Sequence, residues 1–163
     1  MMFTDSHCHL NFPELISDLS AIRQAMAAAQ VSRALCISTT LEEFDEVHAL
    51  AMAYDNFWAS VGVHPDNEGV REPSLQDLLD GAARPKVVAI GETGLDYFRL
   101  QGELEWQRER FRVHIRASRA TGKPLLMAPM KLAWPCWPRP SPSARCLCRS
   151  LSWAASLASS SSP

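Results

Sequence analysis

The chain has 163 residues, of which 47% are hydrophobic and 21% are charged, and its formal net charge is -2. This composition is typical of a soluble globular protein and provides no overall basic field for nucleic acid, so any DNA binding would depend on local groups. The chain does not open with a basic segment and an apolar run, and no apolar stretch reaches the roughly 18 residues of a membrane span, which predicts a cytoplasmic protein without membrane association.

Five short apolar segments recur along the first 128 residues. They are residues 3–5, 33–38, 57–63, 86–91 and 125–128. Because these segments lack the polar alternation of a half-exposed sheet, they are typical of parallel strands covered on both faces.

Segments with helical spacing of apolar residues lie between these strands. The first covers residues 15–29, with its apolar residues on one face. The second opens at Thr40, whose side chain can cap a helix while Glu43 reaches back to its backbone N–H. The third opens with Ser-Leu-Gln-Asp at residues 74–77. The residues that this third helix is expected to bury are Leu75, Leu78, Leu79 and Ala82.

A fourth helix is predicted over residues 102–121, with Gly122 and Pro124 as stop signals. Several of its charged residues fall within one arc of about 100° on the helix surface. They are Glu105, Arg108, Glu109, Arg112, Arg116 and Arg119. We interpret this arc as a solvent-exposed face rather than as a stripe that binds DNA.

Buried strands that alternate with amphipathic helices indicate an α/β protein with a parallel sheet. About four βα units and a fifth strand fit into residues 1–128. In such folds, reactive groups gather at the carboxyl ends of the strands, so polar residues there are the first candidates for function.

The first candidate is Asp-Ser-His-Cys-His-Leu at residues 5–10, at the end of the first strand. Alternate residues of a strand point to the same face, so Asp5, His7 and His9 can converge. Two imidazoles on one face make half of a metal site, and Asp5 could be a further ligand or hold the second N–H of a histidine. The alternative is a pair of hydrogen-bonded surface histidines.

Two other strand ends carry ionisable groups. Glu92, in Gly-Glu-Thr-Gly-Leu-Asp-Tyr, follows the fourth strand, where a carboxylate can bridge two divalent cations or else cap a helix. His64 follows the third strand and can bind a substrate phosphate or act as an acid, or serve a structural role. His48 and His114 lie inside helices, and we assign both to packing or to the surface.

In order and spacing, these motifs, followed by Trp-Gln-Arg-Glu-Arg-Phe and Gly-Lys-Pro-Leu-Leu, resemble the TatD family of metal-dependent deoxyribonucleases over residues 1 to about 127. The resemblance implies a TIM (β/α)8 barrel that hydrolyses phosphodiester bonds in DNA with two divalent ions such as Mg, Mn or Zn. By motif, His7 and His9 would bind one ion and Glu92, a catalytic residue, would bridge both. His64 would be catalytic or substrate-binding, and Asp96 substrate-binding.

The chain departs from the family pattern after its fifth strand. The family has a histidine there, another after the sixth strand and an aspartate after the seventh, whereas no histidine follows His114. With far fewer than the roughly 250 residues of a closed barrel, the chain is expected to form an incomplete one. Two alternatives stay open: an amidohydrolase-like metal hydrolase, and an inactive remnant or non-enzymatic interaction module. No protein partner is indicated.

Residues 129–163 differ in composition from the rest of the chain. They contain no acidic residue but three tryptophans and three cysteines among many serines and prolines. A polar linker is normally poor in tryptophan and cysteine, so we interpret this segment as a frame-shifted and disordered tail.

Translation of the encoding DNA in the other two frames tests this interpretation. We expect one frame to give His-Thr-Arg or a close variant from around codon 127, followed by about 130 residues with βα alternation. If neither frame yields a histidine and a long open stretch there, the segment is genuine and the frame-shift interpretation is wrong.

Overall fold

The structure is a computed structural model that describes residues 2–128. Its five strands are β1 (Phe3–Cys8), β2 (Val31–Cys36), β3 (Phe57–Val61), β4 (Val87–Thr93) and β5 (Leu125–Met127). Each coincides with one of the five predicted apolar segments to within a few residues. The predictions for residues 129–163 lie outside the described residues.

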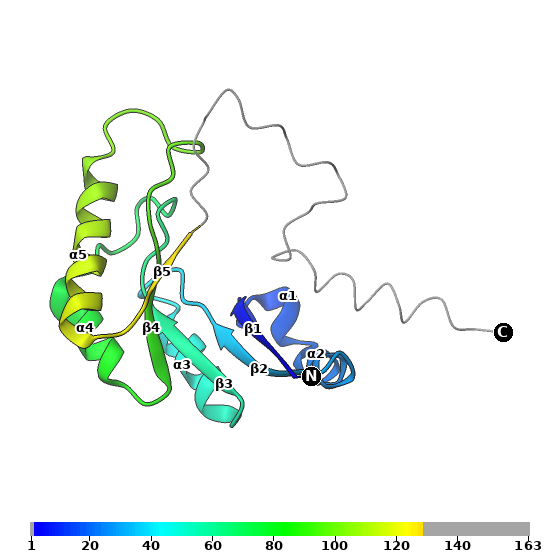
Figure 1. Cartoon of the computed structure of the whole chain (residues 1–163). Helices are drawn as coiled ribbons and strands as arrows, with labels where there is room; N and C mark the ends of the chain where they lie inside the picture. The colour runs from blue at the N-terminus through cyan, green and yellow to red at the C-terminus, as the bar shows by residue number, and fades with distance from the viewer. Residues whose placement is uncertain (1, 129–163) are drawn as a thin grey trace.

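The strands form one parallel sheet in the order β1-β2-β3-β4-β5, so each strand lies beside its neighbours in the sequence. The sheet is curled, and helices cover its outer face (Figure 1). Sequential parallel strands with helices outside are the arrangement of a (β/α)8 barrel. The described residues therefore form about half of a TIM barrel, which confirms the α/β fold class.

The helices are α1 (Pro13–Ile16), α2 (Leu19–Ala28), α3 (Phe44–Ala53), α4 (Leu75–Ala83) and α5 (Glu105–Thr121). Their apolar faces and the outward side chains of the strands form one hydrophobic core. Its fully buried members include Val47, Phe57, Val61, Leu78 and Ile90. Removal of this apolar surface from water is the main stabilising contribution to such a core.

Two helices begin differently from the sequence prediction. The segment at residues 15–29 is divided between α1 and α2, with Ser17 and Asp18 outside both. The next helix, α3, begins at Phe44 rather than just after Thr40, and only half of the predicted capping box forms. The Thr40 hydroxyl accepts the Glu43 N–H at 3.2 Å, but the Glu43 carboxylate binds the Thr39 hydroxyl instead.

The other two helices follow the sequence more closely. Ser74 and Asp77 form a complete capping box at the start of α4. Leu75, predicted to be buried, is exposed because it lies in the first turn of α4, outside the face that packs on the sheet. After α5, Gly122 adopts the left-handed conformation with φ 68°, as the stop signal predicted.

The charged arc of α5 is exposed, as predicted. Arg112 pairs with Glu105 and Glu109, and Arg116 also pairs with Glu109. These ion pairs within one helix neutralise much of the positive charge, which supports the interpretation of this face as solvated surface.

Both outer strands have a free side within residues 2–128, since β1 pairs there only with β2 and β5 only with β4. Phe3 on β1 is 51% exposed and Met127 on β5 is 46% exposed. Unpaired strand edges with apolar side chains favour association with further strands. No helix in residues 2–128 has both the length and the apolar character needed to cross a bilayer.

Candidate metal centre

The carboxyl end of β1 places two imidazoles on the inner side of the curled sheet. His7 and His9 alternate with Cys8, which points the other way into the core. His9 donates its Nδ1–H to the Ile37 carbonyl at 3.2 Å, and this bond fixes the tautomer that leaves Nε2 free as an electron-pair donor.

Glu92 approaches the same point from β4 and is only 3% exposed. Its position depends on two glycines that let the ends of three strands come close. A Cβ on Gly62 of the β3 end would lie 2.5 Å from Gly91 Cα, and a Cβ on Gly91 would lie 2.4 Å from the Leu126 carbonyl oxygen. No residue larger than glycine fits at either position without a shift of the backbone.

Three imidazoles surround the Glu92 carboxylate. Nε2 of His7 lies 3.3 Å from Oε2, and Nε2 of His9 lies 3.9 Å from the same oxygen. Nε2 of His64 lies 3.8 Å from Oε1. Potential ligand atoms of His7, His9 and Glu92 all lie within 4.8 Å of one another. The structure thus brings together four of the six candidate site residues.

The charges of these groups are coupled. The hydrogen bond with Glu92 raises the pKa of His7 against the opposing effect of burial. Burial, helped by the nearby His7, lowers the pKa of His9. Burial alone would raise the pKa of Glu92, but the hydrogen bond from His7 and the neighbouring imidazoles outweigh it, so this pKa is lowered. Glu92 is therefore an anion at neutral pH.

His64 is held from its other side. Its Nδ1 contacts the Asp66 carboxylate, which also forms an ion pair with Arg99. Nε2 consequently faces Glu92. Sequence reasoning identified His64 but not Asp66, although an acid two residues after a candidate histidine is a signal that could have been used.

The carboxylates of Asp96 and Asp5 bind backbone N–H groups instead of joining the cluster of His7, His9 and Glu92. The Asp96 carboxylate accepts the backbone N–H groups of Phe98 and Arg99, both at 2.9 Å, and so orders the loop after β4. The Asp5 carboxylate accepts the backbone N–H of His7 at 3.0 Å. Asp5 was one candidate to hold the second N–H of a histidine, but in His9 the Nδ1–H is bound by the Ile37 carbonyl.

His48 and His114 were assigned to packing or to the surface, and both are buried. His114 donates Nδ1–H to the Arg110 carbonyl at 2.8 Å and accepts the Val63 N–H on Nε2 at 3.0 Å. Both ring nitrogens are thus occupied in the neutral form. Burial lowers the pKa of His114 to about 4.

This buried histidine predicts a pH dependence of stability. Between about pH 4 and pH 6.5 the unfolded chain binds a proton at His114 that the folded chain excludes, so the free energy of unfolding falls as the pH falls. Relative to His114→Gln, the wild type should lose about 2 kcal/mol between pH 7 and pH 5. Urea unfolding of both proteins at both pH values measures this, and a constant difference would contradict it.

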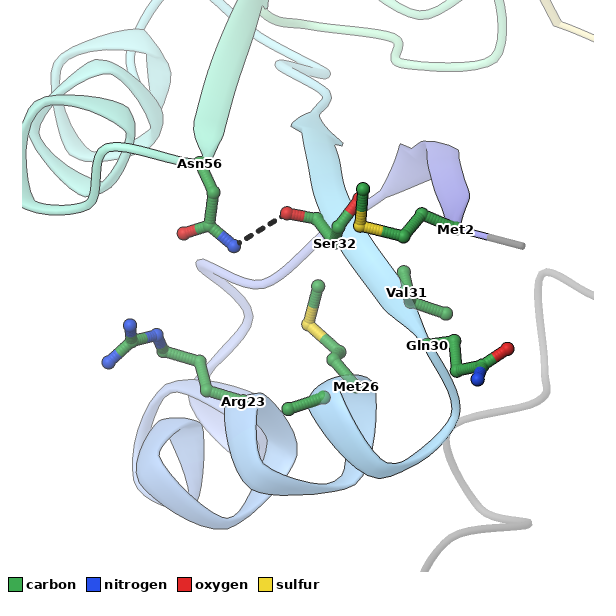
Figure 2. Close-up of a pocket in the computed structure, with 8 residues that line it drawn as sticks. Met2, Arg23, Met26, Gln30, Val31, Ser32 and Asn56 are labelled. Atoms are coloured by element: carbon green, nitrogen blue, oxygen red, sulfur yellow. Dashed lines mark hydrogen bonds between the residues drawn. The ribbon is translucent and has the colours of Figure 1, made fainter.

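Figure 2 shows a pocket that lies at the amino ends of the strands, away from the candidate metal centre. It has a volume of about 410 Å³, and Arg23 and Met26 of α2 form one side. Val31, Ser32 and Asn56 lie at the amino ends of β2 and β3, with the Asn56 amide bound to the Ser32 carbonyl. It contains none of the candidate site residues.

Two imidazoles and a buried carboxylate at the carboxyl ends of barrel strands form a group that could hold a metal ion. The family model "TatD related DNase" matches residues 4–127. The chain belongs to this family, which confirms the resemblance seen in the sequence.

Individual relatives agree with this assignment. The uncharacterized metal-dependent hydrolase YcfH of Escherichia coli K12 is 37% identical over 131 residues, which cover 78% of this chain and 49% of that protein. The 3'-5' ssDNA/RNA exonuclease TatD of Escherichia fergusonii is 31% identical over 124 residues, covering 76% and 48%.

A solved structure agrees as well. The crystal structure of YjjV, a TatD homolog from Escherichia coli K12, superposes with a TM-score of 0.69 and 34% identity. The match covers 77% of this chain and 49% of that one. The chain thus spans about half the length of the relatives that it matches.

Proposed function

We propose that this chain contributes to a metal-dependent phosphodiesterase that cleaves DNA with a dinuclear divalent centre. The observation that carries the proposal is the convergence of His7, His9 and Glu92 on one point at the catalytic end of the barrel. Membership of the TatD-related DNase family supports it.

The donor atoms suit a divalent cation. Glu92 is buried and charged, and its only ion-pair partners among the described residues are imidazoles, so no arginine or lysine competes for its carboxylate. Neutral imidazole and carboxylate together favour Zn, Mn, Fe or Co. Buried charge of this kind is stabilised when it coordinates a metal.

Each residue has a proposed role. His7 and His9 would hold one divalent ion, and Glu92 would be a ligand of that ion and of a second. When bound, the ions supply positive charge that attracts and polarises a phosphodiester. His64 lies beside Glu92 with its Nε2 toward the site, where it can donate a hydrogen bond or proton to a phosphate oxygen. Asp96 is proposed to contribute to substrate binding, because its carboxylate orders the loop that follows β4.

The choice of DNA as substrate rests on the family and on one relative named as an exonuclease for single-stranded DNA and RNA. Because the chain has a net charge of -2, it provides no overall field that attracts a polyanion, so bound cations or local groups have to supply the attraction. This is the expected behaviour of a site in which metal ions bind the phosphates.

A cleavage assay tests the proposal. End-labelled single-stranded and duplex DNA are incubated with the 163-residue chain or with a complete version of the protein, and with Mg²⁺, Mn²⁺, Zn²⁺ or a chelator. From the complete version we expect cleavage that requires the cation and disappears in Glu92→Gln. If the chain binds cations but cleaves no DNA, it is a metal-binding module without this activity. Hydrolysis of amide substrates in its place would favour the amidohydrolase-like alternative.

A further inference from the structure

The side of α5 turned toward the sheet carries polar residues where apolar ones are usual. Gln107, Arg110 and His114 are spaced i, i+3 and i+7 and are all at most 2% exposed. Long polar side chains are rarely buried this completely without a specific set of partners. Arg110 also lies outside the exposed charged arc of the same helix.

Every one of these side chains binds the backbone of the segment that carries His64. His114 accepts the Val63 N–H at 3.0 Å. Arg110 donates to the His64 carbonyl at 2.7 Å and to the Asn67 carbonyl at 2.9 Å. Gln107 donates to the Pro65 carbonyl at 2.9 Å. The segment of residues 63–67 is thus bound to α5 by four hydrogen bonds.

Arg110 is held in place for this task. Its Nε and Nη2 bind the two oxygens of Glu72, and its guanidinium carbon lies 4.7 Å from the Trp106 ring centroid. A planar guanidinium can bind a carboxylate with one edge and carbonyl groups with another, which an ammonium group cannot do. The buried charge is therefore fully paired while two of its bonds fix the loop.

The same helix reaches the second loop of the site. The Gln107 side-chain oxygen accepts the Asp96 backbone N–H at 3.0 Å, while its nitrogen binds Pro65. One buried amide thus joins the loop that carries His64 to the loop that carries Asp96. The two residues expected to meet the substrate are positioned by one face of one helix.

We propose that Arg110 is a positioning residue of the candidate site, which through the His64 and Asn67 carbonyls sets the place and orientation of the His64 imidazole. Gln107 and His114 hold the same loop through their hydrogen bonds to Pro65 and Val63. The functional meaning of this support rests on the proposed role of His64, but the positioning itself is measurable without any activity.

Nuclear magnetic resonance of the full 163-residue chain with labelled histidine tests this at one fixed pH. His64→Gln assigns the His64 imidazole signals. In Arg110→Met these signals should shift, and amide hydrogen exchange of residues 63–67 should become at least about tenfold faster, since two charge-assisted bonds are lost. Arg110→Lys should recover part of both effects, because an ammonium group can still donate to a carbonyl.

Arg112→Met is the matched control, since Arg112 lies on the exposed face of α5 and binds only Glu105 and Glu109 among the described residues. It should leave the His64 signals and the exchange of residues 63–67 unchanged. Wild-type His64 signals in a folded Arg110→Met chain would overturn the proposal. If Arg110→Met does not fold, Glu72→Gln replaces it in the test, because Glu72 is exposed and its substitution weakens the ion pair that holds Arg110. Shifted His64 signals in Glu72→Gln would support the proposal, and unshifted signals would overturn it.

A calorimetric titration with Zn²⁺ separates this inference from the proposed function. Arg110→Met should bind Zn²⁺ as the wild type does, because His7, His9 and Glu92 make no contact with Arg110. If the wild type binds no Zn²⁺, the proposed metal centre is wrong. The His64 signals would still show whether Arg110 positions His64.

Discussion

Replacement of Glu92 with glutamine is expected to lower the affinity of the chain for Zn²⁺ or Mn²⁺ at least about 100-fold, since loss of even an outer-shell partner commonly costs 10- to 100-fold. The amide keeps the shape of the side chain but removes the negative charge on which three imidazoles converge. His7→Ala removes a proposed ligand and should have a comparable effect. Isothermal titration measures both affinities.

Neither substitution removes much core volume, so the far-ultraviolet circular dichroism of both variants should match the wild type. Glu103→Gln is a suitable control, because it makes the same chemical change at an exposed residue of the loop between β4 and α5. It should leave the affinity unchanged. Equal affinities for the wild type and Glu92→Gln would show that Glu92 is not a ligand, and in a complete version of the protein both site variants should also abolish metal-dependent DNA cleavage.

Gly62→Ala is expected to be strongly destabilising, although it adds only one methyl group beneath the site. Its Cβ would lie 2.5 Å from Gly91 Cα and 2.6 Å from Gly91 C, and backbone atoms cannot move aside as a flexible side chain can. Overpacking of this kind costs about 3 kcal/mol, which for a domain of this size lowers the melting temperature by about 10 °C. Thermal unfolding followed by circular dichroism measures this.

Gly69→Ala provides the matched comparison. Gly69 has φ +72° and nothing within 4 Å of the added Cβ, so only the left-handed backbone conformation opposes alanine there. The expected cost is about 1 kcal/mol. If Gly62→Ala were no more destabilising than Gly69→Ala, the close approach of β3 and β4 beneath Glu92 would not be a feature of the protein in solution.

The fold could be predicted from the sequence because its signals are local. Unbroken apolar segments mark buried parallel strands, and Ser74 with Asp77 marks a helix start that forms as expected. Predictions were wrong where another local contact, or the position of a residue at a helix end, competes with the predicted pattern. Glu43 binds Thr39 instead of completing a capping box, and Leu75 faces solvent although its spacing suits the apolar face.

The candidate site was predictable for a related reason. His7, His9 and Glu92 lie at strand ends, and parallel strands bring their carboxyl ends to one edge. The hydrogen bonds by which α5 holds the loop of His64 were not predictable, because they join residues that are distant in the sequence. Arg110 binds Glu72 and His64, which lie 38 and 46 positions earlier. In a helix rich in arginine, only its place outside the charged arc distinguished Arg110 from its neighbours.

The central claim is that His7, His9 and Glu92 form a metal site, and the metal content of the purified 163-residue chain tests it most directly. After equilibration with Zn²⁺ or Mn²⁺ and removal of free ions, elemental analysis should find at least one divalent ion per chain, and about two if the dinuclear centre forms. The Glu92→Gln chain should retain far less. A folded wild-type chain that retains no ion would contradict the account and leave the chain a remnant of a metal-dependent hydrolase.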